Sequence, residues 1–72
     1  MKFYYYPETD YLHIGLTEKP SVDSQEIVPC LVVDFDVSGN PVGIDIDHAS
    51  KFVNLSRLEV NSLPVQALAL AA

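Results

Sequence analysis

The chain has 72 residues, 49% of them hydrophobic, and carries ten acidic against four basic side chains, a formal net charge of −6 at pH 7. A chain of this length forms one domain whose core supplies roughly 3–5 kcal/mol of stability, so a partner or staple must add to it. The charge excludes a nucleic-acid-binding surface, which needs clustered Lys and Arg to displace counterions from phosphates. It permits a basic protein partner, although solubility alone also explains an acidic surface.

The single cysteine, Cys30, cannot form an internal disulfide. Met1 and Lys2 lead directly into a strand pattern, without the apolar core of a signal peptide. The longest uncharged stretch, residues 60–72, is too short and too polar for a membrane span. We therefore expect a cytoplasmic protein that does not associate with membranes and that covers its surplus apolar surface by forming a homodimer.

The N-terminal residues predict a β-hairpin whose strands, 2–6 and 11–17, flank the turn residues Pro7–Asp10. Proline presets φ and aspartate bonds to the neighbouring backbone, so this segment is predicted to be a four-residue loop. The loop places Tyr6 opposite Tyr11 and divides the side chains between two faces. One face is predicted to carry Phe3, Tyr5, Leu12, Ile14 and Leu16, and the other Tyr4, Tyr6, Tyr11 and His13.

A polar connector, residues 18–25, precedes Glu26–Val28, which we expect to begin a third strand, with Pro29 at an edge or bulge. The stretch 31–47 then alternates between apolar and polar residues on both sides of Ser38–Pro41, which predicts a second hairpin. The predicted register pairs Asp36 with Pro41, Phe35 with Val42, Val33 with Ile44 and Leu31 with Ile46. It sets four acids on the solvent-exposed face: Asp34, Asp36, Asp45 and Asp47.

A short helix is expected from His48 to about Ser56, with Asp47 as its N-cap, because Ala49, Phe52 and Val53 lie on one helical face. The predicted fold is α+β: a small antiparallel β-meander of two hairpins, about four strands, with this one short C-terminal helix. It forms a single domain over residues 1–60, followed by an apolar tail over residues 61–72. The predicted core consists of Phe3, Tyr5, Leu12, Ile14, Val33, Phe35, Ile44 and Phe52.

Three motifs resemble those of a known family. Residues 5–14 (YYPETDYLHI) resemble Y-x-P-E-x-D-x-L-x-I, residues 34–46 (DFDVSGNPVGIDI) resemble D-x-D-x-x-G-x-x-x-G-I-E-I, and Ala49-Ser50-Lys51 resembles A-S-K. The chain is thus similar, over residues 1–51, to the small prokaryotic domain-of-unknown-function family twenty-two eighty-three. The resemblance implies a compact sheet-plus-helix domain with no established activity, and an antitoxin-like partner of a small basic toxin in some members. Asp45 stands where the family usually has Glu, which argues against a carboxylate of fixed catalytic reach.

The second hairpin also resembles a calcium loop, because Asp34, Asp36, Ser38 and Asp45 fall at the first, third, fifth and twelfth EF-hand positions. Strand patterns rather than helices flank this loop, and the twelfth residue is Asp rather than the longer Glu. The favoured interpretation is therefore a hairpin turn in which Gly39 takes a positive φ, with no metal or cofactor. A divalent-metal-binding module is the alternative.

Catalytic patterns are weak in this chain. His13 and His48 could act as a base or a ligand, but there is no paired zinc spacing, no nucleophile elbow and no phosphate loop. We therefore assign no catalytic residue, and keep a small enzyme of unknown reaction as the third option.

Tyr4, Tyr6, Tyr11 and His13 form the predicted interface, because tyrosine combines a large area with few rotors and a polar tip. The alternative is that the short helix packs over this face. The favoured function is a small dimeric protein-interaction module that associates through this face or through an edge strand and is antitoxin-like in its use of a basic partner. The final Leu70-Ala71-Ala72 resembles a trans-translation degradation tag, with a plain disordered tail as the favoured alternative.

Overall fold

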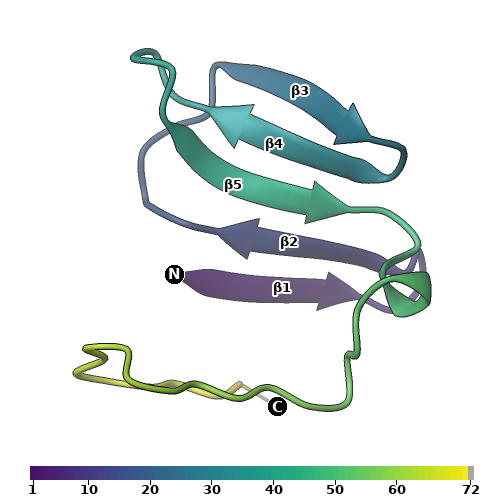
Figure 1. The fold of residues 1–72 in the computed structure, drawn as a ribbon, viewed down its shortest axis with the longest axis vertical. Coiled ribbons are helices and arrows are strands. Elements are labelled where there is room, and N and C mark those ends of the chain that lie inside the picture. The colour runs from purple at the N-terminus through teal and green to yellow at the C-terminus, as the bar shows by residue number, and fades with distance from the viewer. Residues whose placement is uncertain (72) are drawn as a thin grey trace.

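The computed structural model describes residues 1–71, which form one five-stranded antiparallel sheet and a single turn of 3-10 helix (Figure 1). The elements are β1 (Lys2–Tyr6), β2 (Tyr11–Gly15), β3 (Asp23–Val28), β4 (Leu31–Phe35), β5 (Pro41–Ile46) and η1 (Ala49–Lys51). The strand order is β1-β2-β5-β4-β3. The antiparallel sheet is confirmed, but it has five strands rather than four. It is not a meander, because β5 lies between β2 and β4.

β1 and β2 form the predicted N-terminal hairpin in the predicted register, with Tyr6 opposite Tyr11 and Phe3 opposite Ile14. Asp10 closes the loop with φ 53°, a left-handed conformation that Asp tolerates better than most non-glycine residues. The polar loop therefore sets the register of the whole hairpin.

β4 and β5 form the second predicted hairpin. Leu31 faces Ile46 and Val33 faces Ile44, as the alternation of apolar residues predicts. The register is thus confirmed along the part of the hairpin that carries the apolar side chains.

The predicted pairing at the tip of this hairpin is wrong. Phe35 faces Pro41 rather than Val42, because the register shifts between Asp34 and Phe35. Val42 is the additional residue of the bulge, and its side chain is only 5% exposed. Its carbonyl accepts the backbone N–H groups of the segment after β2, at 2.9 Å from Leu16 and 3.4 Å from Thr17. The bulge therefore ties the connector that leaves β2 to the centre of the sheet.

Asp36 does not join the other acids on the exposed face. It is 6% exposed, and its carboxylate accepts the N–H groups of Ser38 and Asn40, each at 2.9 Å. Gly39 adopts φ 81°, as predicted. Asp36 acts as the cap of the turn, because a short carboxylate can satisfy turn amides that have no strand partner.

β3 begins at Asp23, three residues earlier than the predicted Glu26, and pairs with β4 as an edge strand. Its register shifts between Glu26 and Val28, directly before the turn formed by Pro29 and Cys30. Cys30 takes φ 72° in this turn. Residues 23–25, which were predicted as part of the polar connector, thus form the first half of β3. Their polar composition does not indicate a strand, because an exposed edge strand needs few apolar residues.

Register divides the side chains of the sheet between two faces, since directly paired residues point to the same side. The apolar face carries Phe3, Tyr5, Leu12, Ile14, Leu31, Val33, Ile44 and Ile46. The polar face carries Tyr4, Tyr6, Tyr11, His13, Val32, Asp34 and Asp45. The buried core lies on the apolar face, where Leu12, Ile46 and Ala49 pack together.

The predicted helix over residues 48–56 is wrong: one turn of 3-10 helix forms, and residues 1–71 contain no α-helix. His48 rather than Asp47 is the N-cap residue, with φ 53° and no side-chain hydrogen bond. Phe52 is 64% exposed, so its predicted core position is also wrong, whereas Ala49 is completely buried. The segment after the turn, Val-Asn-Leu-Ser, is poor in strong helix formers, so helix is not propagated.

Of the other predicted core residues only Leu12 is buried, whereas Ile14, Val33, Phe35 and Ile44 are partly buried. Phe3 and Tyr5 are 50% and 42% exposed, although they lie on the apolar face. Residues 53–58 run over this part of the sheet and line with it an open cavity of about 440 Å³.

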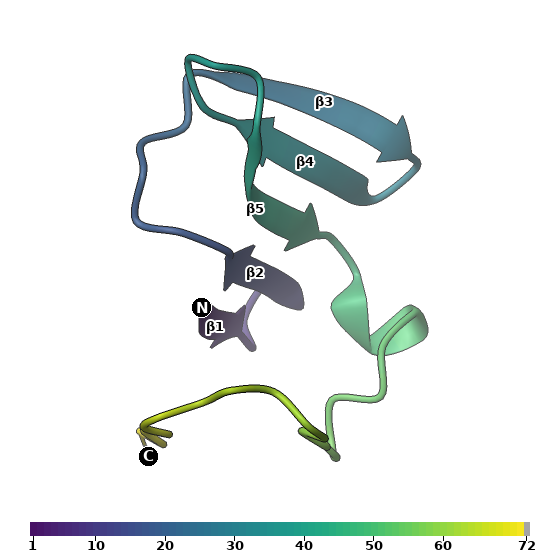
Figure 2. The same ribbon diagram turned by 60° about the vertical axis from the view of Figure 1, so that its left-hand side comes forward.

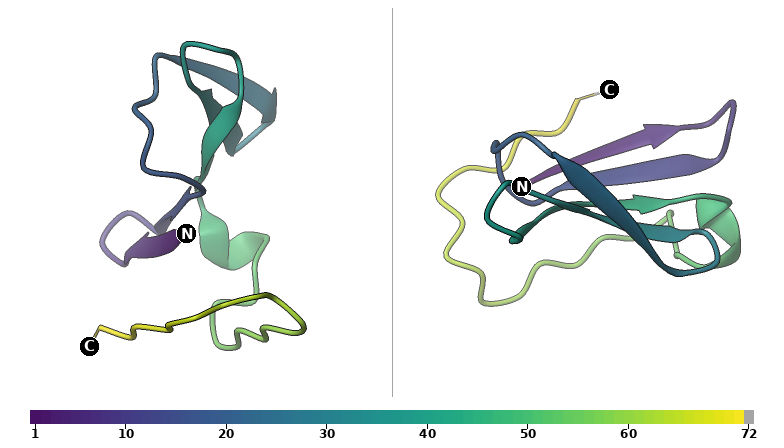
Figure 3. Two further views of the ribbon diagram at one scale, coloured as in Figure 1. Left: turned by 90° about the vertical axis from the view of Figure 1, so that its left-hand side faces the viewer. Right: turned by 90° about the horizontal axis from the view of Figure 1, so that it is seen from above.

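After η1 the chain turns back along the β1 side of the sheet, as Figures 1 and 2 show. Figure 3 shows the twist of the sheet and the tail separated from β3 and β4. The predicted tail spans residues 61–72, and its described part, residues 61–71, has no helix or strand. The predicted degradation signal includes Ala72, which lies outside the described residues. None of the helical structure in residues 1–71 is long and apolar enough to cross a bilayer.

Candidate functional site

Three side chains that can bind a metal or move a proton meet on the polar face. His13 comes from β2, Asp34 from β4 and Asp45 from the central strand β5. His13 and Asp45 are directly paired across β2 and β5, and Asp34 faces Gly43 on β5. One side-chain donor atom of each of the three lies within 4.8 Å of the other two.

Asp45 is the centre of this group. His13 Nδ1 lies 2.6 Å from its Oδ1, and the Tyr11 hydroxyl donates to the same oxygen. Asp34 in turn accepts the hydroxyl of Ser24, at 2.7 Å. We call the four residues Tyr11, His13, Asp34 and Asp45 the Asp45 cluster.

The two carboxyl groups titrate as a pair. The hydrogen bond with Asp45 and then burial raise the pKa of Asp34 above its ordinary value. Burial opposes ionisation of Asp45, but the hydrogen bonds from Asp34, Tyr11 and His13 outweigh it and lower the pKa of Asp45. Of the two carboxyl groups, Asp34 is therefore the one that loses its proton at the higher pH.

Tyr11 stays protonated beside this pair. Burial first, and then the hydrogen bond to Asp45, raise the pKa of its hydroxyl above the ordinary value. The hydroxyl is thus a permanent donor that orients the Asp45 carboxylate.

Gly43 leaves the space that the cluster occupies. A Cβ atom built at this position would lie 3.0 Å from Asp34 Oδ2 and 3.3 Å from His13 Cε1. Any larger residue would push the carboxylate and the imidazole apart. The glycine therefore has a steric role in the site.

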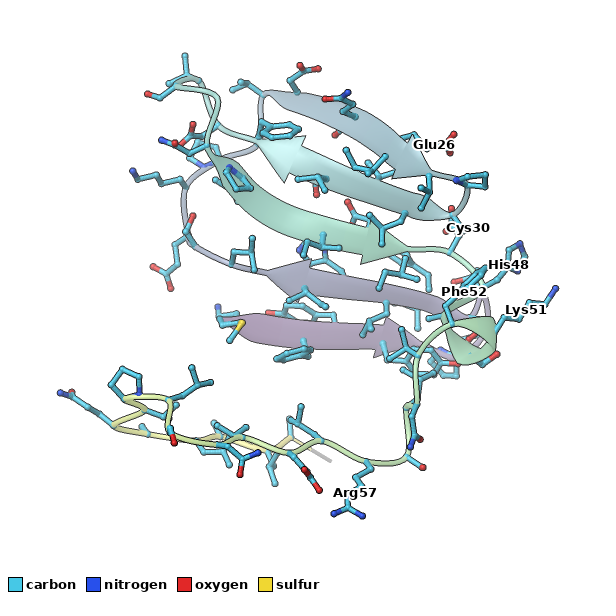
Figure 4. The ribbon with its side chains drawn as sticks, viewed as in Figure 1. Glu26, Cys30, His48, Lys51, Phe52 and Arg57 are labelled. Atoms are coloured by element: carbon cyan, nitrogen blue, oxygen red, sulfur yellow. The ribbon has the colours of Figure 1, made fainter. Side chains whose placement is uncertain are left out.

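No lysine or arginine neutralises the two acids. Within residues 1–71 the ion pairs are His13 with Asp45 and Arg57 with Glu59. Figure 4 shows Arg57 on the segment after η1, directed away from the sheet, and His48 beside η1 at the end of the sheet. The cluster can therefore hold a divalent cation, or hold and transfer a proton.

The structure brings together only part of the predicted metal loop. Asp34 and Asp45 meet, but Asp36 and Ser38 remain at the hairpin tip, where Asp36 binds backbone amides. The third donor is His13, which lies outside the loop. The sequence indicates His13 as a possible ligand, but it does not predict the pairing of β2 with β5 that brings His13 to these two acids.

The predicted interface residues do lie together on the polar face. Tyr4 and Tyr6 are each 46% exposed. Tyr6 stacks on Tyr11 with ring centroids 5.4 Å apart, and Tyr4 lies 6.2 Å from the ring of His13. η1 packs on the apolar face through Ala49, so it does not cover the tyrosines.

A second group of hydrogen bonds joins the two ends of the domain. Asp10 accepts the Tyr5 hydroxyl at 2.8 Å and the Ser50 hydroxyl at 2.6 Å, and its carbonyl accepts the N–H of Ala49 at 2.9 Å. We call Tyr5, Asp10 and Ser50 the Asp10 cluster. It connects the first hairpin to η1, which indicates that these motif positions have a structural role.

The family model described as "Protein of unknown function (DUF2283)" matches residues 2–50, which include all five strands and the start of η1. No curated protein and no solved structure matches the chain.

Proposed function

Since the chain belongs to the DUF2283 family of proteins of unknown function, we propose from its geometry that it is a small protein-interaction module that works as a homodimer. The observation that carries this proposal is a single-layer sheet whose apolar face is only partly covered. A sheet of one layer excludes water from neither face unless another layer packs on it.

The small number of buried side chains supports the proposal that a second layer packs on the apolar face. Among residues 1–71 the buried hydrophobic side chains are Leu12, Val42, Ile46 and Ala49, and no large side chain is fully buried. Residues 53–58 cover the β1–β2 part of the apolar face but leave the cavity of about 440 Å³ against it. A second copy would complete the burial of Phe3, Val33 and Ile44 in each chain, and each Å² of apolar surface so removed from water adds about 25 cal/mol.

The size of the face sets what such a dimer requires. Five strands about 4.8 Å apart and about 17 Å long give a face of roughly 400 Å², part of which residues 53–58 already cover. A stable interface buries about 800 Å² on each partner. The exposed apolar side chains after residue 57 would supply the rest, among them Leu58, Leu63 and Leu68, which are 62%, 50% and 69% exposed.

Oligomeric state tests the proposal. Light scattering at micromolar concentration should give twice the chain mass of 8.0 kDa. Phe3→Ser should shift the protein toward monomer, whereas Tyr4→Ser should remain dimeric. The two variants are matched, because the residues are neighbours on β1, are about equally exposed and point to opposite faces.

A monomeric wild-type protein would refute the homodimer. Dissociation by Tyr4→Ser but not by Phe3→Ser would place the interface on the polar face instead.

The polar face and the charge support a further partner of opposite charge. The chain has a net charge of −6, and Tyr4 and Tyr6 stay half exposed beside the acids of the polar face. A basic protein, as in an antitoxin–toxin pair, would be steered to this surface and would dissociate as salt rises. Capture from the native host should recover such a protein with wild-type bait but not with Tyr6→Ser bait.

A further inference from the structure

We propose that His13, Asp34 and Asp45 bind a divalent transition-metal ion, with Zn²⁺ bound more tightly than Mn²⁺, Ca²⁺ or Mg²⁺. The site goes beyond the proposed interaction function and does not depend on dimer formation, because all three ligands come from one chain.

The ligand set and its spacing favour such an ion. One imidazole nitrogen and two carboxylate oxygens suit Zn²⁺ at bond lengths of about 2.0–2.2 Å, which places neighbouring ligands roughly 3.3 Å apart. The donor atoms here lie within 4.8 Å of one another, so small side-chain rotations bring them to that spacing. The 2.6 Å approach of His13 Nδ1 to Asp45 Oδ1 would open slightly as the ion replaces the bridging proton.

Charge gives a second reason. Two carboxyl groups lie side by side in a site with no lysine or arginine partner in the described chain, so ionising both is unfavourable without a cation. A divalent ion neutralises the pair. Neutral imidazole then completes the set without adding positive charge.

The surrounding residues hold the ligands in position. Ser24 donates to Asp34 at 2.7 Å and Tyr11 donates to Asp45, so each carboxylate has its own hydroxyl partner. Such outer hydrogen bonds orient metal ligands and increase affinity. The three ligands also stand on strands rather than loops, and Gly43 keeps the space between them free.

The site is open enough for ion exchange and for a further ligand. The His13 and Asp45 side chains are 33% and 20% exposed. Three protein ligands leave a fourth position for water or for a group from another molecule. The imidazole nitrogen disfavours Ca²⁺ and Mg²⁺, which prefer oxygen ligands.

Calorimetric titration of untagged protein with Zn²⁺ tests the site. We expect one ion per chain, weaker binding of Mn²⁺, and the weakest binding of Ca²⁺ and Mg²⁺. His13→Asn should raise the dissociation constant at least about tenfold. His48→Asn is the matched control, because it removes the other histidine and places Asn in a left-handed conformation that it tolerates.

The acids allow the same comparison. Asp34→Asn should weaken Zn²⁺ binding, and the exposed Asp47→Asn should not. Gly43→Ala should also weaken binding, because the added Cβ displaces Asp34 and His13. Circular dichroism on each variant identifies any that fail to fold, and the histidine and aspartate pairs keep the test decisive if Gly43→Ala is lost.

No binding heat at millimolar Zn²⁺ would overturn the proposal. So would equal weakening by His13→Asn and His48→Asn, which would mean adventitious binding at any histidine. Light scattering of the same samples measures the oligomeric state separately. These substitutions should leave the homodimer unchanged, so a failure of metal binding and a failure of dimer formation can be told apart.

Discussion

The Asp10 and Asp45 clusters share a composition and differ in what surrounds them. In each, an aspartate accepts a tyrosine hydroxyl, from Tyr5 at Asp10 and from Tyr11 at Asp45. Asp10 then receives only neutral donors, the hydroxyl and N–H of Ser50. Asp45 instead lies against an imidazole and a second carboxyl group.

This difference indicates a structural role for the Asp10 cluster and a binding role for the Asp45 cluster. A carboxylate saturated by neutral donors has little capacity left for a ligand, and it links parts of the chain 40 residues apart. Two neighbouring carboxylates repel each other when both are ionised, and a bound cation or cationic substrate can neutralise that repulsion. In this protein the familiar motif residues Tyr5, Asp10 and Ser50 belong to the first kind. The residues proposed for binding include His13, which lies at a position that the motif Y-x-P-E-x-D-x-L-x-I leaves unspecified.

The largest effect on stability is expected for Asp10→Ala. It removes the bonds from Tyr5 and Ser50 and places alanine at a positive φ. The midpoint of thermal unfolding should fall by roughly 10 °C, followed by circular dichroism at fixed protein concentration. Asp47→Ala, at a nearby exposed acid, is the control and should unfold near the wild-type temperature. Equal melting of the two variants would remove the structural role of the Asp10 cluster.

Asp10 should also make the stability of the fold depend on pH in the acidic range. Hydrogen bonds from the Ser50 side chain and then from Tyr5 hold the pKa of Asp10 below its ordinary value of 3.8. A carboxylate with a lowered folded-state pKa stabilises the fold above its unfolded-state pKa and loses that contribution as pH falls through the folded value.

Stability should therefore be constant near neutrality and decline below pH 3.8, the ordinary value for Asp10. Asp36, whose pKa is lowered by the backbone amides of Asn40 and Ser38, adds to the decline. Thermal melts across this range should show a shallower decline in Asp10→Asn. An unchanged slope would contradict the assignment.

A smaller effect is expected for Asp45→Asn. The amide oxygen still accepts from Tyr11, and the change removes one of two competing acids, which offsets the weakened contact with His13. The unfolding midpoint should change by no more than about 3 °C, measured by the same melts. A loss as large as that of Asp10→Ala would make both clusters structural and remove the contrast between them.

The smallest effect is expected for Phe52→Ala. The side chain is 64% exposed, and η1 is held by Asp10 rather than by an apolar helical face. The free energy of unfolding should change by less than about 0.5 kcal/mol, measured in urea. A loss of several times that size would place Phe52 in a contact that the isolated chain does not make, such as a dimer interface.

The sequence pattern predicted those features of the fold that depend on residues close together in the chain. Both hairpins, the division of their side chains between two faces and the positive φ of Gly39 follow from alternation and turn chemistry. The bulge at Val42 did not follow, since it depends on the connector that donates to its carbonyl. The helix failed because the interactions of η1 come from Asp10, far away in sequence.

The site was predictable only in part for the same reason. Asp34 and Asp45 share a hairpin, so their proximity follows from its register. His13 joins them through the pairing of β2 with β5, which links two hairpins that the sequence presents as separate units. Alternation of apolar and polar residues within a strand predicts which face of the sheet a side chain lies on. It does not predict which residue of another strand lies beside it.

The central place of β5 has a consequence for synthesis on the ribosome. The first hairpin emerges early but is only marginally stable alone, since an isolated two-stranded ribbon buries too little surface. Its partner strand, Pro41–Ile46, is the last of the five to be made, and Ser50 follows it. The nascent chain therefore keeps an open strand edge until residues 41–50 have left the exit tunnel, and only then can the five strands pair as one sheet.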